Sequence, residues 1–292
     1  MSIVQTDSLH RFLFEGNQVR GEIVHLDATW RAMHGRLDYP AAVRNLLGEA
    51  AAASALLTPT LKFDGRLTLQ VTGEGPVYLL VMQCTSDNTL RGLARWHGEP
   101  QESELGALIG AGRMAITIDP ERGRERYQGI VEVQGRQLAN SLEAYFERSE
   151  QLGTRLWLAA DESRAVGLLL QQLPGEAEDA DAWNRVQQLG ATLTREELLG
   201  LPPQELIRRL FSEEDIRLFE PTPLSFRCGC SRSSIESVLR GLGREEVRSI
   251  LAEEGAIKVD CEFCGQHYEF DSIDAENLFQ GIPSAPVPPT RH

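Results

Sequence analysis

The spacing of hydrophobic residues divides the first 173 residues into one long helix and a series of short strands. From Tyr39-Pro40 to Leu57, apolar residues recur at helical spacing, and proline suits the first turn of a helix, so a helix with a buried face is expected. Residues 67–71 alternate apolar with polar and residues 77–82 are continuously apolar, which predicts a half-buried strand and a central strand. Further strands are expected at 90–96, 114–118, 127–133, 155–159 and 166–170, and an amphipathic helix at 138–149.

These elements predict an α+β domain over residues 1–173. So many strands with short connections favour an antiparallel or mixed sheet covered by helices over a doubly wound parallel sheet. Gly73-x-Gly75 resembles the start of a nucleotide-binding loop, but Tyr78 stands where a third glycine is needed. We therefore expect a turn between two strands at this point.

The next segment, residues 174–224, is predicted to be an acidic and then helical linker. It begins at Leu173-Pro174-Gly175 with a short run of acidic residues, and Thr194 and Glu197 then form a capping box ahead of a short helix. Pro202-Pro203 ends that helix, and another follows at 204–211. Helices this short are marginal in water and must pack on something. Periodicity alone leaves open whether their apolar face is permanent core or a metastable cover.

Residues 225–272 form a small cysteine-containing module, followed by a segment at 273–292 whose tail beyond Gly281 is rich in Pro and Ser and expected to be disordered. Ser233-x-x-Glu236 predicts a capped helix that ends near Gly241, and a further helix is expected at 244–255. Strands are predicted at 257–259 and at 267–270.

Composition narrows the classes of function. The net charge is −14 and the pI about 5.0, so binding to nucleic acid or to anionic membranes is not expected. Lys62 and Lys258 are the only lysines and neither lies in a phosphate-binding loop, so any activity is expected to be independent of ATP. We find no hydrolase motif and predict that the protein is not an enzyme. Without a signal peptide or a membrane-length apolar run, we expect a cytoplasmic protein whose thiols are kept reduced.

Four of the five cysteines occur in two tight pairs, Cys228-x-Cys230 and Cys261-x-x-Cys264. This spacing predicts that four thiolates converge on one zinc ion. His267 is an alternative fourth ligand, although the four cysteines suffice. Cys84 follows a predicted buried strand and is interpreted as a small core residue.

The same cysteines are candidates for redox chemistry. Zinc-bound thiolates are open to oxidants, and each cysteine has a partner two or three positions away, so Cys228–Cys230 and Cys261–Cys264 disulfides are expected on oxidation, with loss of zinc. A disulfide between residues two apart closes a very small ring, which should raise its reduction potential and make it easy to reverse. A module of this size has too small a hydrophobic core to be stable without the metal, so losing zinc should unfold it.

The two cysteine pairs, about thirty residues apart after an acidic helical linker, resemble the redox module of the bacterial 33 kDa heat-shock protein family. The resemblance covers nearly the whole chain, because the segments that begin at Tyr39-Pro40, Leu61-Lys62 and Tyr145-Phe146 are also similar to that family's N-terminal domain. Cys84 is not part of the family pattern, so no role is carried onto it.

The resemblance implies a redox-regulated holdase chaperone. Family members are inactive when reduced and zinc-bound; oxidation by peroxide with heat, or by hypochlorite, releases zinc and unfolds module and linker. The exposed surface then holds unfolding client proteins without ATP under oxidative and heat stress. Oxidised members tend to form homodimers, and clients pass to the ATP-driven 70 kDa heat-shock system.

Two other classes of function remain open from the residues. A thiol oxidoreductase would use the C-x-x-C pair, but that motif normally begins a helix, whereas Cys261 follows a predicted strand. A structural zinc ribbon that docks a partner would keep its metal under oxidant. The net charge of −2 over residues 226–270 and the C-x-C pair argue against a ribbon that binds nucleic acid.

Overall fold

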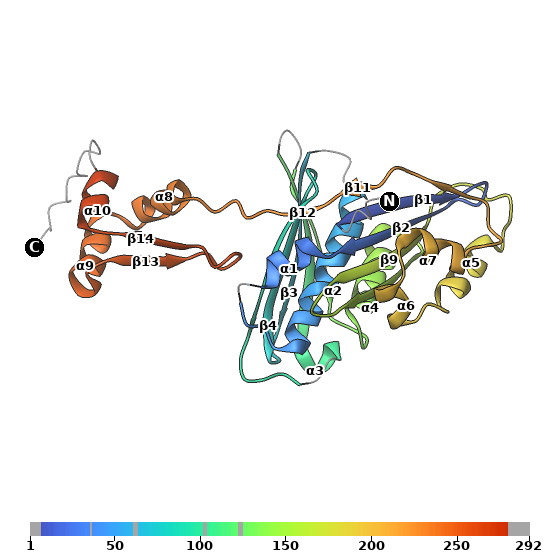
Figure 1. The fold of residues 1–292 in the computed structure, drawn as a ribbon, viewed down its shortest axis with the longest axis horizontal. Helices are drawn as coiled ribbons and strands as arrows, with labels where there is room; N and C mark the ends of the chain where they lie inside the picture. Colours follow the sequence, from blue (N-terminus) through green and yellow to red (C-terminus); the bar gives the residue numbers. More distant parts are fainter. Residues whose placement is uncertain (1–6, 36, 61–63, 102–103, 122–124, 280–292) are drawn as a thin grey trace, which may run out of the picture. The chain divides into compact units, whose positions relative to one another are not determined.

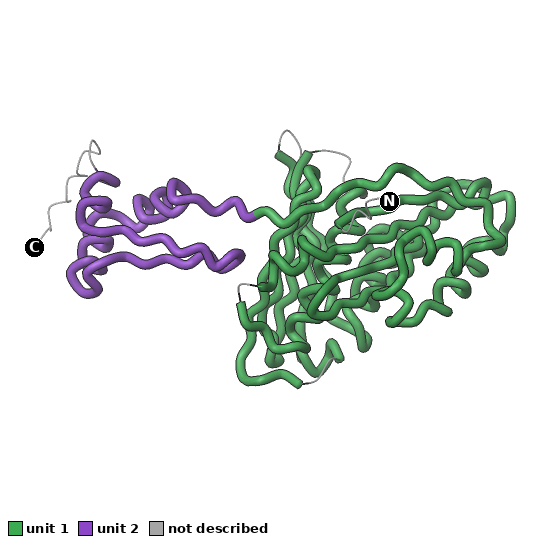
Figure 2. Tube along the Cα trace, viewed as in Figure 1, with its two compact units in different colours: residues 1–227 green, residues 228–292 purple. Residues whose placement is uncertain are grey.

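The computed structural model describes residues 7–35, 37–60, 64–101, 104–121 and 125–279. Contacts divide the chain into two compact units, Met1–Arg227 and Cys228–His292 (Figure 2). The segment 174–224, expected to be a linker, lies within the first unit. The predicted disordered tail beyond Gly281 and the lysine at position 62 lie outside the described residues.

The first sheet of unit 1, here called sheet A, is antiparallel and has the order β10-β1-β2-β9-β8, with β11 also pairing with β1 (Figure 1). Its first two long strands were not predicted from the sequence, because His10, Arg11, Arg20, Glu22 and His25 interrupt the apolar pattern. The strands are β1 (Ser8–Phe14), β2 (Val19–Leu26), β8 (Thr154–Ala160), β9 (Ala165–Gln172), β10 (Ile216–Leu218) and β11 (Thr222–Pro223).

The second sheet of unit 1, sheet B, has the order β12-β5-β4-β3-β6-β7. All its pairs are antiparallel except β12 with β5, so the mixed α+β architecture expected from the sequence is confirmed. Gly73 and Gly75 belong to the connection between β3 and β4, as predicted. The strands are β3 (Gly65–Gly73), β4 (Val77–Thr85), β5 (Thr89–Trp96), β6 (Gly112–Pro120), β7 (Tyr127–Glu132) and β12 (Ser225–Phe226).

Helix α2 (Ala41–Leu57) contacts strands of both sheets and forms the centre of the main core. Alanines occupy much of its length, and their small side chains let both sheets approach closely. A helix that is apolar on all sides is a buried helix, and here the burial extends well beyond the single face predicted. Neither α2 nor any other helix of the described residues is long and apolar enough to cross a membrane. The other helices of this part are α1 (Ala28–His34), the 3-10 turn Thr58–Thr60, α3 (Leu105–Ile109) and α4 (Leu138–Tyr145), which continues as a π-helical turn over Phe146–Glu150.

Three short helices, α5 (Ala182–Gly190), α6 (Arg195–Gly200) and α7 (Pro203–Leu210), cover the face of sheet A that points away from α2. Leu168 packs with them while the next residue, Leu169, packs in the main core, because alternate residues of a strand point to opposite faces. The predicted capping box is confirmed: Glu197 N donates to Thr194 Oγ1 over 3.2 Å, and Thr194 N donates to Glu197 Oε2 over 3.0 Å.

Up to Phe279, where the described residues end, unit 2 consists of three helices and a two-stranded hairpin. The elements are α8 (Arg232–Leu242), α9 (Arg244–Glu254), β13 (Ile257–Asp260), β14 (His267–Phe270) and α10 (Ser272–Leu278). Its buried core is small for a folded unit. The buried members of this core are Leu239, Val247, Ile257, Phe270, Ala275, Leu278 and Phe279.

The capping box predicted at Ser233 and Glu236 is wrong. The N-cap of α8 is Ser231, whose Oγ accepts a hydrogen bond from Ser234 N over 3.2 Å. Helix α8 therefore begins two residues earlier than predicted, at Arg232. Glu236 lies inside the helix, with a carboxylate oxygen 3.4 Å from the guanidinium of Arg240.

A buried carboxyl group in sheet A predicts how stability depends on pH. Within the described residues Glu22 Oε2 is buried without a hydrogen-bond partner, and burial raises the pKa of Glu22 to about 7 despite the attraction of Arg20 and Arg11. Between pH 4.5 and about 7, the carboxyl group of Glu22 therefore keeps its proton in the folded state, whereas in the unfolded state, with a pKa near 4.5, it has released it. This contribution to stability is present below pH 4.5 and is lost as the pH rises to 7.

We therefore expect Glu22→Gln to leave the free energy of unfolding nearly unchanged at pH 4.5. At pH 8 the variant should be more stable by roughly 3 kcal/mol, because the pKa of Glu22 rises from 4.5 to about 7 on folding and each pKa unit corresponds to about 1.4 kcal/mol. Urea unfolding at both values measures the difference, with Glu132→Gln on an exposed position of β7 as the matched control. Equal stability of Glu22→Gln and parent at pH 8 would contradict the expectation.

Candidate metal centre

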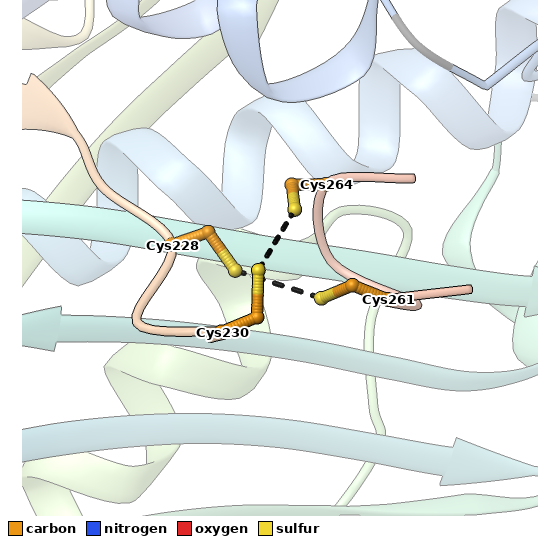
Figure 3. A group of neighbouring side chains, drawn as sticks. All are labelled: Cys228, Cys230, Cys261 and Cys264. Carbon is orange, nitrogen blue, oxygen red and sulfur yellow. Dashed lines mark hydrogen bonds between the residues drawn. The ribbon is translucent and has the colours of Figure 1, made fainter. Parts of the chain in front are cut away.

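The structure brings together the four cysteines that the sequence singled out. The Sγ atoms of Cys228, Cys230, Cys261 and Cys264 all lie within 4.8 Å of one another, as Figure 3 shows. Two of these contacts are 3.6 Å between Cys228 and Cys261 and 3.3 Å between Cys230 and Cys264. Each of these contacts joins one residue from the first pair to one from the second.

Two chain reversals position these sulfur atoms. Cys261 and Cys264 lie in the turn between β13 and β14, where Gly265 N donates to Cys261 O over 2.7 Å and Cys261 N donates to Gln266 O over 2.9 Å. Gly265 has a φ of 65°, a left-handed conformation that glycine adopts without strain. The first pair lies in the extended segment immediately before Ser231 caps α8. The second pair is thus fixed by local backbone bonds of the turn, and the first pair lies directly before the capped start of α8.

The donor set fits zinc. Around a tetrahedral zinc ion with Zn–S distances of about 2.3 Å, neighbouring sulfurs lie about 3.8 Å apart, close to the short contacts between the pairs. Four thiolates held this close repel one another unless a cation lies among them. Cys264 is buried and the other three are partly buried, which suits a closed structural site that oxidants can still reach.

Tyr268 on β14 contributes a hydrogen bond that the sequence analysis missed. Its Oη donates to Cys230 Sγ over 3.2 Å. Burial opposes ionisation of Cys230, but the hydrogen bonds from Tyr268 and the other thiols outweigh it and lower the pKa of Cys230 to about 7. The position could have been found from the sequence, because Tyr268 lies in the strand predicted directly after Cys264.

Other candidate residues do not join the cluster. His267 Nδ1 lies 2.7 Å from Asp260 Oδ1, so this histidine is paired outside the group of four sulfurs. Arg232, two residues after Cys230, binds Asp274 at 2.7 Å and stacks on Phe270 at 4.2 Å.

Cys84 on β4 is buried in the main core of unit 1, as predicted. Burial raises the pKa of Cys84 to about 12. It is therefore a neutral thiol near pH 7, without the thiolate that oxidants attack.

Comparison with known proteins places the chain in a family. A family model described as Hsp33 protein matches residues 7–271. The 33 kDa chaperonin of Nitrosococcus oceani is 55% identical over 98% of this chain and 99% of its own, and that of Methylobacillus flagellatus is 50% identical over 94% of each. The crystal structure of the 33 kDa chaperonin from Thermotoga maritima has the same fold, with a TM-score of 0.83 over 94% of this chain and 98% of its own, at 23% identity.

The chain belongs to the Hsp33 protein family.

The cluster predicts how the protein responds to loss of one ligand. We expect Cys264→Ser to reduce bound zinc from about one ion per chain to nearly none, because a serine hydroxyl is not a thiolate ligand. Unit 2 should then lose its hydrogen-exchange protection in α9 and β13, since its own core is too small to hold it. Elemental mass spectrometry and hydrogen exchange measure the two effects. Cys84→Ala is the matched control and should keep its zinc; full zinc retention by Cys264→Ser would contradict the assignment.

Proposed function

We propose that the protein is a redox-regulated, ATP-independent chaperone that holds unfolding proteins when it is oxidised. The observation that carries the proposal is the cluster of four cysteines within 4.8 Å in a unit with a very small core. Family membership supports the chaperone function, since the relatives are named 33 kDa chaperonin. In the reduced state Cys228, Cys230, Cys261 and Cys264 hold one zinc ion, which links the two chain segments of unit 2.

Oxidation converts these ligands into disulfides. A thiolate attacks one oxygen of a peroxide, hydroxide leaves and a sulfenic acid forms; a second thiolate attacks that sulfur, and a second hydroxide leaves as the S–S bond forms. We propose the pairs Cys228–Cys230 and Cys261–Cys264. The sulfur contacts of 3.6 and 3.3 Å join one pair to the other, but a partner two or three residues away in the chain stays near once the metal is lost and the unit opens.

The surface proposed to bind clients is the face of sheet A beneath α5, α6 and α7. These helices are short and gain most of their stability from packing on that face. Few polar bonds add to this packing: Arg164 Nη1 donates to Leu199 O over 2.7 Å, and Arg195 donates to Ala160 O. Release of the helices would bare a continuous apolar surface. Its members on sheet A are Phe12, Phe14, Val19, Ile23, Ala159, Val166, Leu168 and Leu170.

The remaining parts of the proposal concern setting and partners. We propose a cytoplasmic protein, where reduced thiols keep the metal bound until oxidative stress. Its partners are unfolding clients and the ATP-driven 70 kDa heat-shock system that receives them, and the oxidised form is a homodimer. Nucleic acid and membranes are not expected partners, given the net charge of −14.

Oxidation should switch the protein on. After treatment with hydrogen peroxide at elevated temperature, we expect about one zinc ion per chain to be released, two disulfides to form, and aggregation of a thermally unfolding client to fall several-fold without ATP. Zinc-sensitive dye, peptide mapping by mass spectrometry and light scattering measure the three. Retained zinc would support a structural zinc site, and zinc release without protection of the client would overturn the chaperone proposal.

Weakening the packing of helices α5, α6 and α7 on sheet A should activate the protein in the same way as oxidation. Leu206 on α7 is fully buried, so Leu206→Ala should cost about 2–5 kcal/mol of packing between α7 and the sheet. We expect the reduced variant to suppress client aggregation while it keeps its zinc. Gln204→Ala, on the exposed side of the same helix, is the control. A reduced Leu206→Ala protein with mobile α7 amides in hydrogen exchange and no activity would contradict this role of the face.

A further inference from the structure

One extended segment covers the outer strands of both sheets in unit 1. Residues 215–227, here called the strap, follow α7 and run along β1 and then beside β5 (Figure 1). Through β10 and β11 the strap pairs antiparallel with β1, and through β12 it pairs parallel with β5. The last residue of the strap, Arg227, directly precedes Cys228.

Backbone hydrogen bonds hold the strap at intervals along its length. They involve the same groups that pair strands within a sheet, so the outer strands accept an extended chain of suitable direction. The bonds are Glu15 N to Asp215 O (2.9 Å), Phe219 N to Arg11 O (3.0 Å), Leu224 N to Asp7 O (3.0 Å), Ser225 N to Asn88 O (3.1 Å) and Arg227 N to Leu90 O (3.0 Å).

Side chains contribute less to this attachment. Leu218 is 50% exposed and Phe219 44% exposed, whereas Leu224 is buried in the main core and Phe226 is partly buried against it. The strap is therefore held by its backbone at intervals along its length, with apolar anchors at Ile216 near its start and at Leu224 and Phe226 near its end. Recognition of this kind depends little on sequence, which suits a protein that must bind many unfolded chains.

The strap also keeps the outer strands from pairing with other molecules. A bare strand edge is a template for pairing with another chain, so native proteins cover such edges. Pro221 and Pro223 have no N–H group, which limits the ability of the strap itself to pair further. The edges are thus protected while the strap is in place.

We propose that β1 and the adjoining edge of β5, once the strap leaves them, bind an extended segment of the unfolding client as an added β-strand. The inference rests on the proposed function and names the mode of client binding. The strap itself indicates what these strand edges bind. They pair with an extended chain that has an apolar residue near the position of Leu224. Opening of unit 2 removes the tether that begins at Cys228, the residue next to the strap.

A peptide with the sequence of residues 214–227 tests this mode of binding. Labelled with fluorescein, it should bind the oxidised full-length protein about tenfold more tightly than the reduced protein, and it should compete with client. The control peptide carries N-methyl groups on the amides that correspond to Phe219, Leu224 and Arg227, which removes their hydrogen bonds but keeps every side chain. We expect it to bind about tenfold more weakly than the parent peptide. Hydrogen exchange of the oxidised protein with client bound should show protection in β1 and β5.

Equal binding of the two peptides would overturn the inference and assign the affinity to side chains. Absence of peptide binding, with client aggregation still suppressed, would overturn edge pairing and leave the proposed chaperone function standing. Protection confined to the apolar face of sheet A would likewise assign the client to that face alone. If the oxidised protein fails to suppress aggregation, the proposed function itself fails.

Discussion

The second unit depends on four sulfur atoms held within 4.8 Å of one another. A core of this size gains little from apolar burial, whereas a structural zinc site contributes about 10–16 kcal/mol of apparent binding energy near neutral pH. That is comparable with the roughly 5–15 kcal/mol that stabilises an ordinary domain. With zinc bound as proposed, the fold of this unit would be tied to the protonation and oxidation state of its thiols more than to its side-chain packing.

The two faces of sheet A are covered by different layers, one that belongs to the main core and one that could be released. On one side it packs against the alanine-rich α2, which is buried between both sheets and contributes to a large core. On the other side it packs against helices of six to nine residues, held by a separate apolar cluster and few polar bonds. Losing the second layer would leave the first core intact. A chain can then expose apolar surface without unfolding the sheet that bears it.

The sequence predicted the elements whose signals are local and missed those set by distant pairing. α2, strands β3 to β7 and the capping box at Thr194 follow from periodicity and short motifs, and the cysteine cluster follows from spacing. β1 and β2 carry charged residues that become buried or paired only within the sheet, as Glu22 does. β10, β11 and β12 contain only two or three residues each, so pairing with β1 and β5 defines them. At α8, Ser231 took the capping role predicted for Ser233 because both serines fit the local rule.

The burial of Cys84 affects how completely oxidation of the protein can be reversed. Disulfide exchange proceeds by attack of a thiolate, and a fifth reactive sulfur would add mispaired forms to any oxidised population. Cys84 is sequestered in the core of unit 1, with its proton held to high pH, so it stays outside that exchange as long as unit 1 remains folded. Repeated cycles of oxidation and reduction would then operate on an even set of thiols, and the integrity of the first core would protect the reversibility of the second unit.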